Sequence, residues 1–283
     1  MNRTKRSLIS CGGFVVIGAA IFISTCTECL GRVWGIQPAT NSIVVVDPVT
    51  GGVSGGFTPP GGALTPTQQF GGLTIAEHGA VLLYQNPVAN PTSLFRINPN
   101  TGSLISTEFM PAANDIPDFR AGLSYQSGAG AVGQNAVFAI NDGAPVQRQD
   151  GYGNAVLIDH TPAGATFAGA LGGDDTGRLF LASSGMIIEF NPLVANQVIR
   201  SYSQPAGMGI AAGLAFDGVS LYLSDMNSRL YTIHPDTGAV IRSVLVQSGS
   251  LIGLGAYVPE PGTIALVALG ACIAACRGGR RRA

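Results

Sequence analysis

A turn that recurs along the chain is the sequence feature that most constrains its fold. Clear copies occupy residues 47–51 (DPVTG), 98–102 (NPNTG) and 234–238 (HPDTG), and weaker copies begin at Asp159 and Asn191. The first residue caps the turn, proline fixes φ at the second position, and glycine accepts the positive φ that leads into a return strand. Each copy therefore predicts a tight hairpin between two β-strands.

A second recurring element, Gly-Leu followed by a small residue, opens a strand upstream of most copies. It lies at residues 72–74, 122–124, 213–215 and 253–255. Together the two elements predict four short strands per repeat, and the turns have a mean spacing of about 47 residues, which is typical of propeller blades. The sequence therefore predicts an all-β fold, a β-propeller of about five blades over residues 32–257, with a two-sheet β-sandwich as the alternative.

The ends of this region predict how the ring closes. The strand that starts at residue 32 corresponds to the second strand of a blade, so the first blade lacks its opening strand. Residues 251–257 form an extra strand after the last full blade. We therefore expect the C-terminal strand to complete the first blade, which removes an exposed sheet edge. The copy in residues 174–204 has no clear opening strand, so a three-stranded blade is expected there.

Charge and cysteine content restrict what this region does. Residues 32–257 contain 8 Arg, no Lys and 14 Asp plus Glu, so the net charge of −6 argues against nucleic-acid binding. Its stability must come from an apolar core, because all five cysteines lie outside it, at positions 11, 26, 29, 272 and 276. The Cys26-x-x-Cys29 pair falls at the end of a predicted signal peptide, and we interpret it as part of that segment and not as a redox site.

Residues 1–31 have the layout of a secretory signal peptide. A basic start (Arg3, Lys5, Arg6) precedes an apolar run over residues 8–24. Cleavage is expected between residues 25 and 32. An uncleaved N-terminal anchor and a lipoprotein signal are the alternatives.

The last stretch, residues 258–283, has three parts. Pro259 and Pro261 predict an extended turn, and residues 263–276 then form an uncharged run. As a helix, these 14 residues would extend roughly 21 Å, which is short for a bilayer core of about 30 Å unless the arginines of the basic tail (277–283) lie at the interface. The arginines favour a cytoplasmic C-terminus, and therefore a body on the outer side of the membrane.

The order of these parts resembles the PEP-CTERM sorting signal of bacterial surface proteins. The residues that carry the resemblance, and that we assign to sorting and processing, are Val258, Pro259, Glu260, Pro261, Arg280, Arg281 and Arg282. The resemblance implies an exosortase-type membrane protease as a partner, cleavage near the Pro-Glu-Pro motif, and passage from an inner-membrane-anchored precursor to the cell surface or the extracellular space. An ordinary C-terminal anchor and a core helix with a basic tail are the alternatives. The repeats of the body resemble surface-layer and NHL-like propellers, which mostly bind partners or act as scaffolds.

Candidate chemistry in the body is sparse. Residues 128–133 match G-x-G-x-x-G, but a β-rich segment follows instead of a helix, so we interpret them as a hairpin loop without a nucleotide. The candidate metal or acid–base residues are His78, His160 and His234, the candidate Ca²⁺ ligands are Asp142, Asp150, Asp174 and Asp175, and Asp115 with Asp118 form a candidate carboxylate pair. Turn capping and solvation are the simpler interpretation of these residues. No catalytic, cofactor-binding or metal residue is therefore assigned, and Ca²⁺ is the one cofactor considered.

The sequence thus predicts an exported surface or extracellular-matrix protein whose propeller binds extracellular polysaccharide or another surface protein. An extracellular propeller lyase or hydrolase acting on polysaccharide is the second hypothesis. Ice binding is the third, although the body lacks regular Thr-x-Thr ladders.

Overall fold

The computed structural model describes residues 32–62, 71–85, 93–109, 122–130, 134–140, 146–151, 157–166, 168–174 and 177–257. These residues belong to one unit, Arg32–Val258. The predicted signal helix, the predicted transmembrane helix and the Pro-Glu-Pro motif lie outside the described residues. Within the part that is described, no helix has the length and apolar character needed to cross a bilayer.

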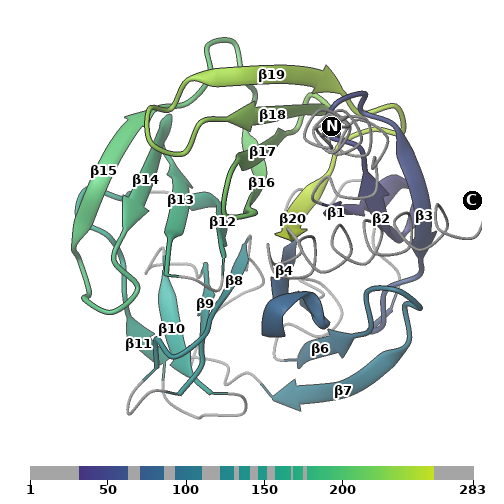
Figure 1. Cartoon of the computed structure of the whole chain (residues 1–283), viewed down its shortest axis with the longest axis horizontal. Coiled ribbons are helices and arrows are strands. Elements are labelled where there is room, and N and C mark those ends of the chain that lie inside the picture. Colours follow the sequence, from purple (N-terminus) through teal and green to yellow (C-terminus); the bar gives the residue numbers. More distant parts are fainter. Residues whose placement is uncertain are drawn as a thin grey trace, which may run out of the picture. The chain divides into compact units, whose positions relative to one another are not determined.

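The described residues form a β-propeller of five four-stranded antiparallel blades, as the turn repeat predicts (Figure 1). The first strand of each blade lies near the centre of the ring and the fourth lies at the periphery. From the inner to the outer strand, the blades are β20 (Ile252–Tyr257), β1 (Arg32–Gln37), β2 (Ser42–Val46) and β3 (Val53–Phe57) in blade 1; β4 (Gly72–Ala76), β5 (Val81–Gln85), β6 (Ser93–Ile97) and β7 (Leu104–Phe109) in blade 2; β8 (Leu123–Gln126), β9 (Ala136–Ala139), β10 (Gln147–Asp150) and β11 (Leu157–Asp159) in blade 3; β12 (Ala168–Gly173), β13 (Leu179–Ser183), β14 (Met186–Phe190) and β15 (Val198–Ser203) in blade 4; and β16 (Ala211–Phe216), β17 (Leu221–Asp225), β18 (Arg229–Ile233) and β19 (Val240–Leu245) in blade 5. Two short 3-10 helices, η2 (Pro38–Thr40) and η3 (Glu77–Gly79), follow β1 and β4.

The ring closes as expected, because the last strand completes the first blade. Strand β20 pairs antiparallel with β1, from Arg32 opposite Tyr257 to Ile36 opposite Ile252, with a bulge after Gly35. The closing strand is also the innermost strand of its blade, so it contacts β4 and β16 of the two neighbouring blades.

Two details of the predicted repeat are wrong. Blade 4 has four strands, because Ala168–Gly173 (AGALGG) opens it. This segment contains no β-branched or aromatic residue and therefore lacks the usual signature of a strand. Second, Asp159 ends the outermost strand of blade 3 and does not follow its third strand, since the polar segment Gln147–Asp150 (QRQD) occupies the third position.

The inner strands are rich in small residues because they lie very close to one another. A Cβ atom on Gly172 of β12 would overlap the carbonyl oxygen of Leu214 of β16, and a Cβ on Gly122 would overlap the backbone nitrogen of Leu171. A larger residue at these positions would push neighbouring blades apart. The glycine-rich inner strands are therefore a packing requirement of the ring.

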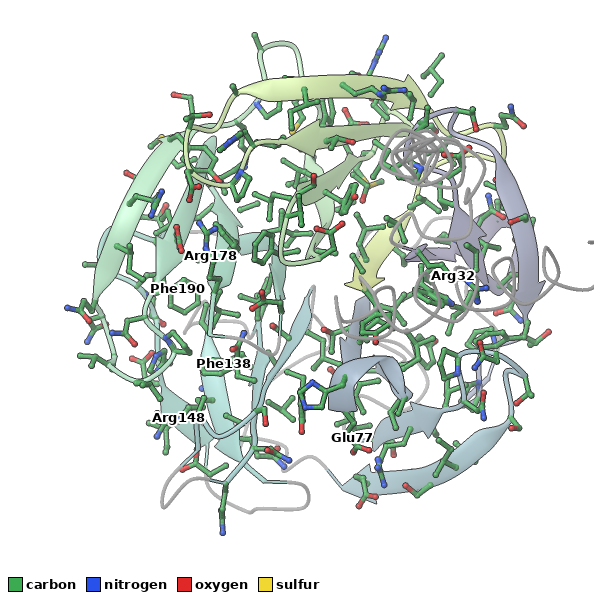
Figure 2. The ribbon with its side chains drawn as sticks, in the orientation of Figure 1. Arg32, Glu77, Phe138, Arg148, Arg178 and Phe190 are labelled. Atoms are coloured by element: carbon green, nitrogen blue, oxygen red, sulfur yellow. The ribbon has the colours of Figure 1, made fainter. Side chains whose placement is uncertain are left out.

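Buried apolar clusters fill the contacts between neighbouring blades, which we call joints. One cluster lies at each of the five joints that the described residues form. Phe138 and Phe190 lie at the joint between blades 3 and 4 (Figure 2), and Phe180 and Phe216 meet edge to face at the joint between blades 4 and 5, with ring centroids 5.1 Å apart. These clusters stabilise a body that has no disulfides.

Candidate functional site

Three of the recurring turns, which we call the docking turns, are residues 47–51, 98–102 and 234–238. Each connects the third strand of its blade to the outermost strand. Oδ1 of Asp47 accepts a hydrogen bond from the Val49 nitrogen (2.8 Å), and Oδ1 of Asn98 and Nδ1 of His234 accept the equivalent bonds at 2.9 and 3.1 Å. The capping role predicted for the first residue is confirmed.

The carboxylate of Asp47 shows how strongly the turn favours its capping residue. Burial alone would raise the pKa of Asp47, but hydrogen bonds from Thr50 and Val49 and the positive charge of Arg242 hold this pKa below its ordinary value. The turn therefore stabilises the ionised form of its own capping side chain.

The glycine of each docking turn contacts the outer strand of the preceding blade. A Cβ atom on Gly51 would overlap the Leu245 carbonyl of β19. A Cβ atom on Gly102 would overlap the Phe57 ring of β3, and one on Gly238 would overlap the Tyr202 ring of β15. All three glycines also have φ near +70°. Glycine is thus required twice, once for the turn and once for the contact between blades.

Two arginines on outer strands bind the docking turn of the next blade in equivalent ways. Strands β15 and β19 begin with the same four residues, Val-Ile-Arg-Ser, so that Arg200 and Arg242 occupy matching positions. Nη1 of Arg200 donates to the carbonyl of Asp236 (3.3 Å) and Nη1 of Arg242 to the carbonyl of Val49 (3.2 Å). Asp236 and Val49 are both the third residue of their turn, so the same contact holds blade 5 against blade 4 and blade 1 against blade 5.

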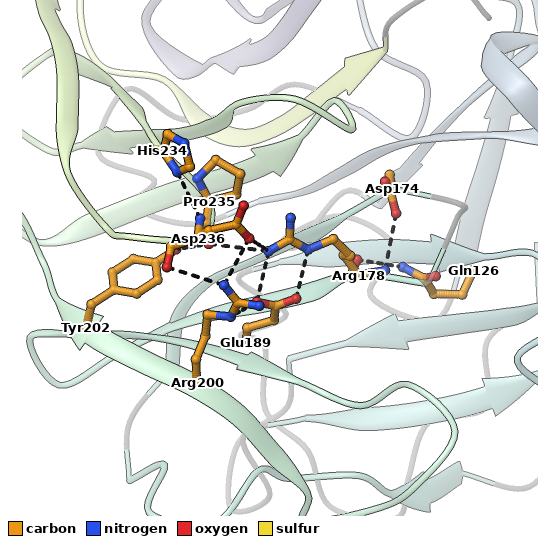
Figure 3. A network of polar contacts seen from close by, with 9 residues as sticks. All are labelled: Gln126, Asp174, Arg178, Glu189, Arg200, Tyr202, His234, Pro235 and Asp236. Carbon is orange, nitrogen blue, oxygen red and sulfur yellow. Dashed lines mark hydrogen bonds and ion pairs between the residues drawn. The ribbon is translucent and has the colours of Figure 1, made fainter.

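A network of four charged side chains forms the polar part of the joint between blades 4 and 5 (Figure 3). Glu189 of β14 contacts Arg178 through Oε1 at 2.8 Å and Arg200 through Oε2 at 2.7 Å. Both arginines also contact Oδ1 of Asp236, each at 2.9 Å. Two positive and two negative charges therefore neutralise one another.

The surroundings of Arg178 fix its guanidinium group. The group lies 5.1 Å from the ring centre of Phe180 and 5.0 Å from that of Phe216, and the hydrogen bond to Glu189 raises the pKa of Arg178. Because every charge in the network has a partner of opposite charge, the network is suited to holding the turn of blade 5.

Replacing Glu189 by glutamine is expected to lower the free energy of unfolding by about 2 kcal/mol, because two arginines lose their shared, almost fully buried carboxylate. The expected loss is below the range for fully buried pairs, since both arginines are partly exposed. Urea unfolding measures this change in the free energy of unfolding. The control, Arg229→Gln, removes an exposed charge that makes a long contact to Ser243, and it should change stability by less than about 0.5 kcal/mol. Equal effects of the two substitutions would contradict the role of the network.

The three histidines lie in three different blades. His78 is exposed in η3 of blade 2, His160 is buried after β11 of blade 3, and His234 caps the docking turn of blade 5. Within the described ranges, no group of three or more His, Cys, Asp or Glu side chains is placed to hold a metal ion. The described histidines therefore do not meet at one mouth of the ring.

The described candidate carboxylates serve local contacts. Asp150 pairs with Arg148 at 3.0 Å, and Oδ1 of Asp174 accepts a hydrogen bond from the Arg178 nitrogen at 3.3 Å. The remaining candidates lie outside the described residues, so neither the carboxylate pair of Asp115 and Asp118 nor Ca²⁺ ligation by Asp142 and Asp175 is tested.

The glycine-rich segment that begins at Gly128 connects β8 and β9, which are antiparallel neighbours. Gly128 has φ of +69° and donates to Oδ1 of Asn135, and the Gly130 nitrogen donates to the carbonyl of Gln134 at 2.6 Å. The segment is a strand-to-strand hairpin connection, as predicted, and lacks the following helix that a dinucleotide site needs.

The comparison with protein families concerns the other end of the chain. The family model described as "PEP-CTERM protein-sorting motif" matches residues 258–282. The chain carries a PEP-CTERM sorting motif. This motif implies an exported surface protein that is recognised by an exosortase and processed at the membrane. The residues assigned to sorting, Val258 to Pro261 and Arg280 to Arg282, fall within the matched range but outside the described residues, so their individual roles stay predictions.

Comparisons with whole proteins add no functional information. The search of curated proteins finds no match. The solved structures with similarity include glutaminyl cyclase of Myxococcus xanthus, with 14% identity and a TM-score of 0.44 over 70% of this chain and 74% of that chain. A chain in the structure of the mitotic checkpoint complex has 14% identity and a TM-score of 0.41 over 64% of this chain. The present chain spans about half of that chain (51%).

Proposed function

We propose that this PEP-CTERM protein is an exosortase-processed surface or extracellular-matrix protein whose propeller binds or scaffolds another surface component, either extracellular polysaccharide or a second surface protein. The match of the sorting motif to residues 258–282 carries the proposal. In it, Pro259 to Pro261 form the recognised turn, residues 263–276 span the membrane before processing, and Arg280 to Arg282 hold the cytoplasmic end.

The arrangement of the body supports binding over catalysis. A propeller lyase or hydrolase would need histidines and carboxylates that converge on one substrate. The described histidines lie in separate blades, and Glu189, Asp236 and Asp47 are engaged in contacts within and between blades. We therefore propose binding as the role of the body and keep catalysis as the alternative.

Replacing Pro259, Glu260 and Pro261 together by alanine is expected to block processing, so that the protein keeps its tail and accumulates in the membrane fraction. Alanine removes both the fixed φ angles and the carboxylate that define the turn. Mass spectrometry of the mature C-terminus in each cell fraction measures the effect. Pro205→Ala, in a half-buried loop of the body, is the control and should be processed normally. Unchanged size and surface display of the triple variant would show that the sorting proposal is wrong.

The binding role is tested with the mature protein recovered from the cell surface. Retention on polysaccharide from the same cells, without release of new reducing or unsaturated sugar ends, is the expected result. Release of oligosaccharides would instead assign the protein to the lyases or hydrolases.

A further inference from the structure

The joint between blades 3 and 4 is held by a buried histidine. His160 follows the outermost strand of blade 3 and has no solvent-exposed surface. Its Nε2 atom lies 2.7 Å from the carbonyl oxygen of Asn191, which begins the recurring turn of blade 4. The imidazole ring lies against Phe138 of β9 and Phe190 of β14, with ring centroids 5.2 and 6.1 Å away. His160 therefore connects the two blades through both a hydrogen bond and apolar contacts.

The hydrogen-bond geometry fixes the protonation of the ring. A carbonyl oxygen only accepts hydrogen bonds, so Nε2 must carry the hydrogen in the neutral form. Nδ1 is buried and has no hydrogen-bond partner in the part of the chain that the structure describes. A second proton would have to bind at Nδ1, where it would place a positive charge among phenylalanine rings and where no described residue offers an acceptor.

The charges around His160 come from blade 3. Arg148 and Asp150 of β10 and Asp159 of β11 act on the ring, the arginine opposing its protonation and the two aspartates favouring it. The facing residues of β9 and β14 are the uncharged Phe138 and Phe190. Burial is the largest influence, and it lowers the pKa of His160 below the ordinary value for histidine.

The described contacts between a docking turn and the preceding blade involve no histidine ring. The docking turns of blades 1, 2 and 5 are held by glycine packing, and those of blades 1 and 5 also by arginines. We propose that the joint between blades 3 and 4 is an acid-sensitive contact, which opens when Nδ1 of His160 takes up a proton while the joints made by the docking turns stay closed. The proposal rests on the fold and does not depend on the proposed function.

The direction of the effect follows from the two states. With the joint closed His160 stays neutral, whereas with the joint open its ring is solvated and binds a proton below about pH 6.5. The stabilisation is therefore complete above this pH and falls as the pH decreases toward the lower pKa of the closed state. In an exported protein, the external pH would thus control how much of the Phe138 and Phe190 surface is exposed.

Amide hydrogen exchange of the full chain at pH 7 and pH 5, corrected for intrinsic exchange rates, tests the proposal. The opening equilibrium of β9 and β14 is expected to rise on the order of 20-fold between the two pH values, while that of β17 and β18 in blade 5 should change little. His160→Gln keeps a side-chain donor for the Asn191 carbonyl without a titrating group, and it should remove the pH dependence. His78→Gln and His234→Gln change exposed histidines and should retain it.

If His160→Gln fails to fold, NMR titration of the histidine rings in the unmodified protein tests the proposal instead. His160 should stay neutral below the ordinary pKa of histidine as long as the amides of β9 and β14 are protected, and its protonation should coincide with loss of amide protection in these strands. Protonation of His160 near pH 6.5 with protection retained would overturn the proposal, as would equal pH dependence in the unmodified protein and His160→Gln.

Discussion

Ending the chain at Ser250 is expected to prevent folding of the propeller, because it removes the closing strand β20. This strand buries Ile252 and Leu254 almost completely and pairs with β1 along the length of that strand. Loss of two buried aliphatic side chains alone costs about 4–10 kcal/mol, which is comparable to the whole stability of a typical domain at about 5–15 kcal/mol. Strand β1 would become an open sheet edge beside the exposed apolar clusters of blades 2 and 5.

Circular dichroism and urea unfolding measure this effect. The matched control ends at Tyr257, where the ladder between β1 and β20 ends, and therefore keeps all strands of the described fold. The control should unfold cooperatively, whereas the shorter chain should not. A cooperative transition of similar midpoint in both chains would show that closure by β20 is not required.

Replacing Gly172 by alanine is expected to destabilise the protein by about 3 kcal/mol, a large effect for a single methyl group. The added Cβ would overlap the Leu214 carbonyl and lie against the next residue of β16, and neither backbone atom can move without separating blades 4 and 5. Thermal or urea unfolding measures the change.

Gly185→Ala separates this overlap from the backbone preference of glycine. Gly185 lies in the turn between β13 and β14 with φ of +82° and nothing within 4 Å of an added Cβ, so only the strain of a left-handed residue, about 1 kcal/mol, is expected. A smaller loss at Gly172 than at Gly185 would contradict the close packing of the inner strands.

The two recurring elements predicted the propeller and its number of blades, and the strands at the two ends of the region predicted its closure. The capping residues at 47, 98 and 234 and the glycines four positions later are local signals, because turn geometry depends on the turn residues themselves. Gly-Leu also marked the opening strands of blades 1, 2, 3 and 5, where the pair lies at the start of the strand or within it. The errors in blades 3 and 4 arose where tertiary packing overrides local preference. The segment AGALGG forms a strand by pairing with β13, and its residues are small because the neighbouring blade leaves no room for larger side chains.

The contacts between blades could be predicted only in part. The repeated Val-Ile-Arg-Ser of residues 198–201 and 240–243 was a signal available in the sequence, and it marks the two arginines that bind the next docking turn. The partners of these arginines were not predictable, because Asp236 and Val49 lie 36 and 193 positions away along the chain. The burial of His160 beside Phe138 and Phe190 likewise depends on how two blades meet.

The sequence by itself thus determined the class of fold and the sorting motif, because both depend on short local patterns: turn chemistry, strand content and the order of a Pro-Glu-Pro turn, an apolar run and arginines. The tertiary structure alone decided how the blades are held together. Glycine contacts, the network around Glu189 and the buried His160 each join residues from different blades, and their geometry follows from the ring and not from any one segment.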